Sequence, residues 1–227
     1  MVPFRPHLAA TLSLAQTLAI AGLGAEPQDA LTGWLNAQTN LTTWHAKVRQ
    51  TRSLKSLAQP VTTAGEVWFR APDLFRWELG QPARTIVVRE PHRLTLLYPA
   101  LKRAEIFPLT EDASGPWRDS LALFEAGFPR DRVALESRFN ILSVTPKELN
   151  LEVVLRPRSR AAQRWMQRIE ITIDTRDQAL LATEVILADG SRLRNEFSDA
   201  MVNPPIPPGL LLPGIPTDYE VVEPAQP

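Results

Sequence analysis

The sequence predicts a mainly β protein of the α+β class, with a single curved antiparallel sheet that forms a half-open β-barrel. Helices are expected to cover the concave apolar face of that sheet. Two observations support this prediction: apolar and polar residues alternate in many short segments, and turn-forming residues separate these segments at close spacing. Because each such strand has one apolar face, the sheet must curve and close on a core.

The pattern begins with a helix and then changes to strands. Between residues 28 and 38, Leu31, Trp34 and Leu35 recur at helical spacing, which predicts an amphipathic helix. Over residues 44–50, apolar or amide side chains alternate with histidine and basic residues, which predicts the first strand. The remaining strands are expected at residues 65–70, 74–79, 84–89, 93–98, 102–107, 139–144, 149–155, 169–173, 180–187 and 193–197.

A second helix, inserted between the strands, is expected over residues 117–128. Its shared apolar face carries Trp117, Leu121, Phe124 and Phe128. Further along, Asp189-Gly190 is a strong signal for a two-residue hairpin. From Asn203 onward, frequent prolines forbid a central strand, so we expect a Pro-rich tail along the edge of the domain.

Residues 1–25 have the three-part layout of a secretory signal peptide, and residues 26–227 form the expected mature domain. Arg5 is the only formal charge before Glu26, and an uncharged stretch rich in Leu and Ala follows it. Cleavage is expected after Gly24 or Ala25. An uncleaved anchor is the alternative, although the apolar stretch is barely long enough to span a bilayer. The signal predicts a periplasmic protein that is soluble after cleavage.

Composition excludes several functional classes. The chain has no cysteine, which excludes disulfides, thiolate metal sites, a cysteine nucleophile and a lipidated N-terminal cysteine. The formal net charge is zero, so binding to nucleic acid is not expected. His45 and His92, which remain after signal removal, lack a neighbour at metal-ligand spacing. No catalytic residue, metal or cofactor is therefore expected.

Basic residues gather around Trp165 over residues 156–168, and this segment permits several interpretations. A nucleic-acid patch is one, but export and zero net charge argue against it. A loop that contacts a partner protein or a lipid headgroup is the second interpretation, and a solvated loop is the simplest one.

Residues 65–78, GEVWFRAPDLFRWE, resemble the Gly-x-Leu-x-x-x-x-Pro-x-x-x-x-Trp stretch of the outer-membrane lipoprotein carrier family, the LolA-like proteins. The strand over residues 44–50 is similar to the Phe-x-Ala-x-Phe-x-Gln strand of that family, with Val48 in place of an aromatic residue. The family's spacing continues through Ile86-Val87-Val88, Leu96-Leu97-Tyr98-Pro99 and Ala104-Glu105. The resemblance therefore covers most of the mature chain.

The resemblance implies a carrier and not an enzyme. In this family a half-open barrel shelters the acyl chains of a lipoprotein beneath a helical lid. A monomer is therefore expected, which takes acylated lipoprotein from an inner-membrane transporter to an outer-membrane acceptor. The residues expected to contact lipid are Leu31, Trp34, Trp44, Phe75, Trp77 and Phe124. For Trp34, Phe75 and Trp77, simple packing in the core is the alternative.

One position departs from the family pattern. The family often has an arginine immediately before the turn proline, here Pro72, and that arginine holds the closed lid by hydrogen bonds. This chain has Ala71 there, and Arg70 should point to the opposite face of its strand. The resemblance therefore leaves open how a lid is held.

Two other functions compete with the carrier. One is a sensor or regulatory half-barrel that binds an envelope protein partner or another amphiphile. The other is an envelope hydrolase, for which the sequence offers no convergent polar groups. The sequence also leaves the cargo open between a lipoprotein, a glycolipid and another amphiphile.

Overall fold

The computed structural model describes residues 27–109, 121 and 126–223, and these residues build one large sheet with short helices. The helical elements are α1 (Pro27–Gln38), η1 (Pro99–Leu101), α3 (Arg132–Arg138) and α4 (Arg160–Gln163). The strands are β1 (Thr43–Ser53), β2 (Val61–Arg70), β3 (Leu74–Leu79), β4 (Thr85–Glu90), β5 (Arg93–Tyr98), β6 (Arg103–Pro108), β7 (Phe139–Lys147), β8 (Asn150–Pro157), β9 (Met166–Asp174), β10 (Leu180–Leu187), β11 (Arg192–Val202) and β12 (Glu220–Val222).

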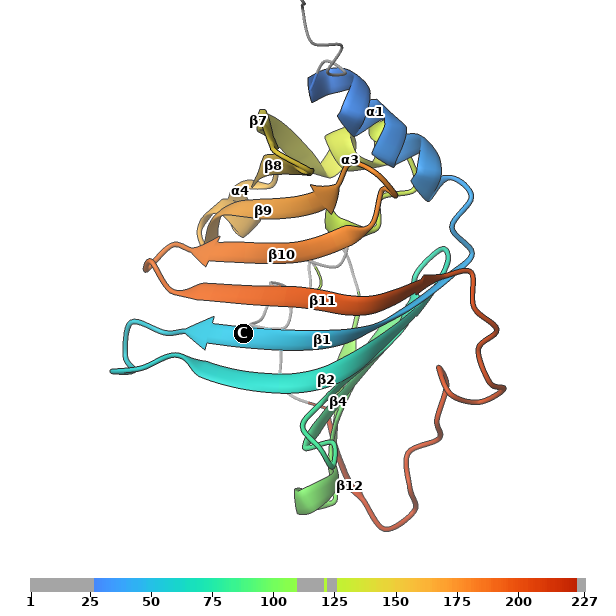
Figure 1. Ribbon diagram of the computed structural model, residues 1–227. Coiled ribbons are helices and arrows are strands. Elements are labelled where there is room, and N and C mark those ends of the chain that lie inside the picture. Colours follow the sequence, from blue (N-terminus) through green and yellow to red (C-terminus); the bar gives the residue numbers. More distant parts are fainter. Residues whose placement is uncertain (1–26, 110–120, 122–125, 224–227) are drawn as a thin grey trace, which may run out of the picture.

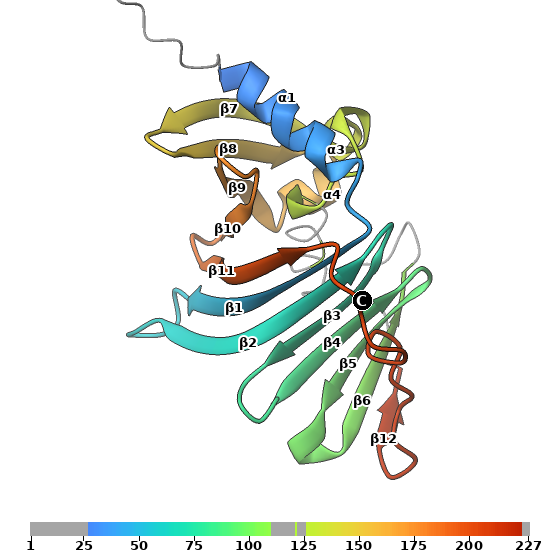
Figure 2. The same cartoon turned by 45° about the vertical axis from the view of Figure 1, so that its right-hand side comes forward.

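All strands belong to one 12-stranded sheet in the order β12-β6-β5-β4-β3-β2-β1-β11-β10-β9-β8-β7. Two meanders, β1–β6 and β7–β11, join where β1 pairs with β11 in antiparallel register. The sheet is not closed, and Figures 1 and 2 show it curving from β7 and β8 at the top to β6 and β12 at the bottom. The predicted half-open, mainly β architecture is confirmed.

Helix α1 covers one half of the concave face. Its apolar stripe of Leu31, Trp34 and Leu35 is buried, as the helical spacing predicted. These side chains share a core cluster with residues of β7, β8, β9 and β10 and with Leu135 of α3. The helices therefore close the β7–β10 half of the sheet against water and leave the β1–β5 half to be filled differently.

The other half of the concave face carries a second core cluster, built from β1, β2, β3 and β5. It includes Trp44, Phe69, Phe75 and Trp77. Phe128 and Phe197 pack against both clusters, so the two halves form one continuous apolar surface. Leu121, from the second helix expected from the sequence, is helical and packs in this cluster.

The described part of the C-terminal tail crosses the convex face and reaches the edge of the sheet at β12, whereas the sequence predicted a tail along the edge of the domain. Arg76 lies on the opposite face of β3 from Phe75 and Trp77, and its Nη1 donates a hydrogen bond to the carbonyl oxygen of Leu210 at 3.2 Å. Leu211 is only 3% exposed. Figure 2 shows the tail lying against β4–β6 before it reaches β12. The tail thus covers part of the convex side of this half of the sheet.

Several details differ from the sequence prediction. β12 forms inside the Pro-rich tail and pairs with β6 in parallel, which is a departure from a purely antiparallel sheet. The sequence also indicated no helix at α3 or α4. Both are short helices whose first turns are capped: Asp131 accepts a hydrogen bond from the backbone N–H of Ala134, and Ser159 from that of Ala162.

Candidate functional site

The concave face holds a cavity of about 400 Å³ between the two halves of the sheet. Strands β3, β4 and β5 form one wall, and the ends of β1, β10 and β11 form the other. The cavity is lined by Gln50, Arg52, Leu54, Phe75, Trp77, Leu79, Thr85, Val87, Leu94, Leu96, Tyr98, Leu121, Val185, Leu187, Arg192, Leu193 and Asn195.

The wall formed by β3–β5 is apolar because of strand alternation. Phe75, Trp77 and Leu79 are successive inward positions of β3, and their neighbours in sequence point to the convex face. Trp77 lies opposite Val87 on β4, and Val87 lies opposite Leu96 on β5. Val87 and Leu96 are only half-buried, so part of their apolar surface is open to the cavity. This wall is suited to an alkyl chain.

A glycine allows β2 and β3 to approach closely behind this wall. Gly65 pairs with Val48 on one side and with Leu79 on the other. At this position a side chain would collide with the backbone of β3. The absence of a side chain therefore lets β2 and β3 come this close next to Leu79, which lines the cavity.

A chain of polar side chains interrupts the opposite wall. Arg52 Nε donates to Gln50 Oε1 at 2.8 Å, and Gln50 Nε2 donates to Asn195 Oδ1 at 3.1 Å. Asn195 Nδ2 then donates to the hydroxyl of Thr183 at 3.3 Å. Gln50, Asn195 and Thr183 are all buried, whereas Arg52 is exposed at the end of β1. The chain thus links the interior of the concave face to solvent.

The strand ends around Arg52, Leu54, Thr85, Tyr98 and Leu187 form the mouth of the cavity. Arg52 and Leu54 are exposed, so the cavity opens to solvent there. The turns that follow β1 and β10 lie at the left in Figure 1. Burial raises the pKa of Tyr98, and nearby Glu105 raises it further, while the charges of Arg103 and then Arg52 act in the opposite direction. Tyr98 is therefore a neutral phenol at the mouth.

The structure places the residues expected to contact lipid at different depths. Phe75 and Trp77 line the cavity. Trp44 lies behind it, with ring contacts to Phe128 and Phe197 at centroid distances of 4.9 and 5.2 Å. Leu31 and Trp34 are fully buried in the other cluster under α1. Phe124 lies outside the described residues. The cavity therefore brings together two of the six residues, and lipid contact by any of them stays a prediction.

The sequence interpretation missed the polar part of the site. Gln50 was visible as the one amide on an otherwise apolar strand face, and its burial was the available signal. Arg52, two residues further on the same face, and Asn195 on β11 gave no such signal. Their proximity depends on the β1–β11 pairing, in which Gln50 lies opposite Asn195.

The two histidines in the described part of the chain lie away from the cavity. His45 is on the opposite face of β1 from Trp44, where its Nε2 lies 3.0 Å from Glu66 Oε2 and its ring stacks on Trp68 at 5.0 Å. His92 is exposed in the turn between β4 and β5. Across the described ranges, no group of three or more histidine, cysteine or acidic residues could hold a metal ion. Nor does any helix in the described part of the chain combine the length and apolarity needed to cross a bilayer.

The family model of the outer membrane lipoprotein carrier protein LolA matches residues 39–210. This range includes β1 through β11 and every described residue that lines the cavity. The chain belongs to the LolA family. Members of this family are carriers and binding proteins, not enzymes, and the family is periplasmic and known for binding lipoproteins and lipids. No curated protein sequence matches the chain.

Solved structures with a similar fold are distant in sequence. An uncharacterized conserved protein from Thermus thermophilus is 14% identical, with a TM-score of 0.49, over 86% of this chain and 98% of that chain. MucB in its complex with MucA from Pseudomonas aeruginosa is 16% identical, with a TM-score of 0.44, over 87% and 64%. A putative outer membrane lipoprotein-sorting domain from Vibrio parahaemolyticus is 13% identical, with a TM-score of 0.43, over 82% and 97%. These likenesses are too distant to carry a functional argument.

Proposed function

We propose that this LolA-family protein is a periplasmic carrier that binds the acyl chains of lipoproteins in its concave cavity. The observation that carries the proposal is the apolar β3–β5 wall, where Val87 and Leu96 keep apolar surface open to the cavity. Each methylene group moved from water into such an environment stabilises the complex by about 0.8 kcal/mol. An acyl chain would therefore gain much by entering.

Beyond binding, the proposed carrier moves its cargo through the periplasm. After cleavage of the signal peptide at residue 24 or 25, the domain from residue 26 onward would carry cargo through the periplasm as a monomer. Its donor would be an inner-membrane lipoprotein transporter and its acceptor an outer-membrane receptor. N-terminal sequencing of the exported protein tests the cleavage step: a mature chain that begins at residue 25 or 26 supports it, and an intact N-terminus contradicts it.

The cargo can be identified directly. The mature protein is purified from its own periplasm, its intact mass is measured by native mass spectrometry, and whatever is bound is extracted and identified. Bound acylated protein supports the proposed function. A protein partner bound without lipid would instead favour the sensor or regulatory half-barrel.

A pair of matched variants links the cargo to the cavity. Val87→Asp places a carboxylate on the apolar wall at a half-buried position, so uptake of a fluorescent acyl probe should fall by about tenfold or more. Val202→Asp makes the same change at the end of β11, where the side chain is 66% exposed, and uptake should stay unchanged. Equal uptake by both variants would show that the probe binds elsewhere.

A further inference from the structure

The described residues that line the cavity carry charge of one sign, and the nearby Glu105 is already paired with Arg103 at 2.8 Å. Among the described residues that line the cavity there are two arginines, Arg52 and Arg192, and no carboxylate. Arg192 has an acidic partner, because its Nη1 lies 3.7 Å from Glu184 Oε1. Glu184 follows Thr183 on β10 and points to the convex face. Arg52 is therefore the cation that the cavity itself presents.

Arg52 is held in place by one edge of its guanidinium. Its Nε donates to Gln50 Oε1, and Gln50 is fixed in turn by Asn195, which is 1% exposed. Within the described part of the chain, Arg52 forms no ion pair, and its two terminal nitrogens donate no hydrogen bond to protein. A guanidinium oriented in this way offers two parallel N–H donors, which is the geometry that carboxylates and phosphates accept.

Arg52 lies at the boundary between the polar and the apolar lining of the cavity. On the other side of the cavity the β3–β5 wall is formed mainly by aromatic and aliphatic side chains. Tyr98, at the end of β5, contributes a neutral hydroxyl, which lies 3.5 Å from Glu105 Oε2. A ligand that fits this lining has an apolar chain directed inward and a negatively charged group at the mouth.

Resting on the proposed function, we infer that the cavity selects acyl ligands with an anionic headgroup and that Arg52 binds this headgroup. The size of the cavity agrees with binding of an acyl chain. About 400 Å³ lies within the range for small-molecule sites, roughly 300–1,000 Å³. Carboxylate and phosphate headgroups share the required chemistry.

The test compares one acyl chain with and without its charge. The mature protein is titrated at about pH 8, where a carboxyl group is ionised, with the fluorescent fatty acid cis-parinaric acid and with its uncharged methyl ester. Wild-type protein should bind the acid about tenfold more tightly than the ester, the effect expected of one charge-assisted hydrogen-bonded pair. In Arg52→Gln this ratio should fall to near one, with the affinity for the ester nearly unchanged.

Two further variants separate recognition from structure. Arg49→Gln removes the same charge from β1 at an exposed position on the opposite face and should keep the wild-type ratio. Arg52→Lys keeps a charge but loses the planar fork, so its ratio should lie between those of wild type and Arg52→Gln. If Arg52→Gln weakens acid and ester equally, or if Arg49→Gln loses the preference too, the inference is overturned.

Competition distinguishes the sources of the anion. Hexadecyl phosphate should displace cis-parinaric acid, whereas inorganic phosphate at the same concentration should not, because it has no chain to bury. Equal displacement by both would indicate an anion site independent of the cavity and would overturn the inference. Failure of wild-type protein to bind either parinaric probe would contradict the proposed function itself. Equal binding of both probes would contradict only the inference about charge.

Discussion

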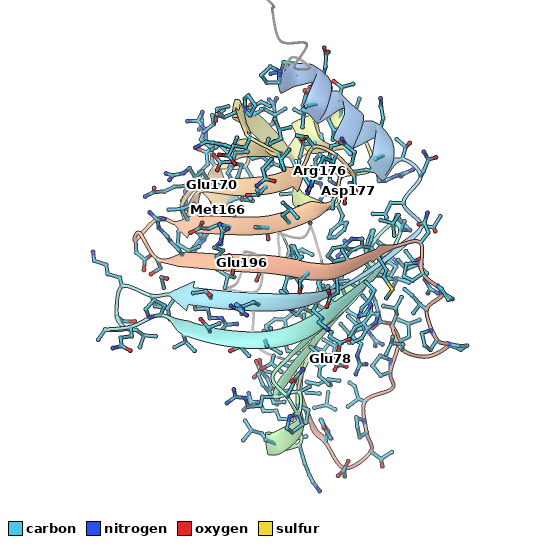
Figure 3. The ribbon with its side chains drawn as sticks, viewed as in Figure 1. Glu78, Met166, Glu170, Arg176, Asp177 and Glu196 are labelled. Carbon is cyan, nitrogen blue, oxygen red and sulfur yellow. The ribbon has the colours of Figure 1, made fainter. Side chains whose placement is uncertain are left out.

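Gly65 and Glu78 approach so closely that no side chain fits between them: a Cβ built on Gly65 would lie 1.8 Å from the carbonyl oxygen of Glu78. Glu78 belongs to β3 and is labelled in Figure 3. The contact lies next to Leu79, which pairs with Gly65 and lines the cavity. The close approach of β2 and β3 beside the cavity therefore requires glycine at position 65.

Gly65→Ala should lower the free energy of unfolding by about 3 kcal/mol. The added methyl group meets backbone, which cannot turn aside as a flexible side chain can, so the two strands must separate. Chemical denaturation measures this loss. Gly33→Ala is the matched control: its Cβ would lie 3.7 Å from Gln178 Oε1, an ordinary contact, and alanine in helix α1 should add about 0.5–1 kcal/mol. Equal stability of the two variants would contradict a role for Gly65 in the close approach of β2 and β3.

Leu211 and Leu212 are adjacent residues of the tail, and together they test whether the tail is part of the folded core. Leu211 is 3% exposed and Leu212 is 48% exposed. Leu211→Ala should lower the free energy of unfolding by about 2–3 kcal/mol, because it opens a hole in buried apolar packing. Leu212→Ala should change it by less than about 0.5 kcal/mol. Thermal or chemical unfolding of the two variants decides whether the tail is part of the folded core, and a silent Leu211→Ala would show that it is not.

Asp174 should make the stability depend on acid pH. Hydrogen bonds from the side chain and then the backbone N–H of Arg176 lower the pKa of Asp174 from 3.8 to about 2. Figure 3 shows Arg176 at the turn between β9 and β10. Because the pKa is lower in the folded state, the ionised carboxylate stabilises the fold above about pH 4. This contribution is lost as the pH falls toward 2.

Asp174→Asn should therefore be less stable than wild type near neutral pH, and the difference should disappear as the pH approaches 2. Arg176→Gln should reduce this pH-dependent contribution of Asp174, because it removes the side-chain hydrogen bond that contributes most to the low pKa. Urea unfolding at a series of pH values measures both. A difference from wild type that stays constant down to pH 2 would assign the effect of Asp174→Asn to packing instead of charge.

The buried amides Gln50 and Asn195 should be energetically coupled. Asn195→Leu leaves Gln50 Nε2 without its acceptor at 3.1 Å, so it should cost about 1–3 kcal/mol. Replacing both residues by leucine removes both polar groups, and the loss should be smaller than the sum of the two single losses by more than about 0.5 kcal/mol. A double-mutant cycle measures this coupling, and strict additivity would show that the hydrogen bond contributes nothing.

Local patterns were sufficient to predict most of the strands. β3, β5 and β10 have the bounds expected from alternation, and the Asp189-Gly190 turn joins β10 to β11, with Gly190 at φ 89°. β2 and β11 extend beyond their predicted ends, because their extra residues are largely polar or exposed and give no alternation. α3 was missed for a similar reason, since Leu135 is its one buried residue and no helical stripe is visible.

The candidate site was predictable only on one side. Alternation in β3 correctly placed Phe75, Trp77 and Leu79 on one face, and they line the cavity. The other wall depends on residues more than a hundred positions away, which reach the site through the pairing of β1 with β11. Trp34 shows the converse. Its helical spacing correctly predicted a buried apolar stripe, but this stripe packs in the cluster of β7–β10 and does not line the cavity. Curvature and long-range register, which alternation does not encode, decide these positions.

The parallel pairing of β12 with β6 also bears on self-association. An open sheet has two edges, and unpaired backbone groups at an edge can recruit a strand from a second copy. On one edge β12 occupies Arg103–Glu105 of β6. On the other, β7 carries Pro146 and a register shift between Ile141 and Ser143, both of which disfavour further pairing. The short strand in the tail therefore takes the place beside β6 that a neighbouring molecule would otherwise fill, and its 3 residues leave only a short edge for further pairing.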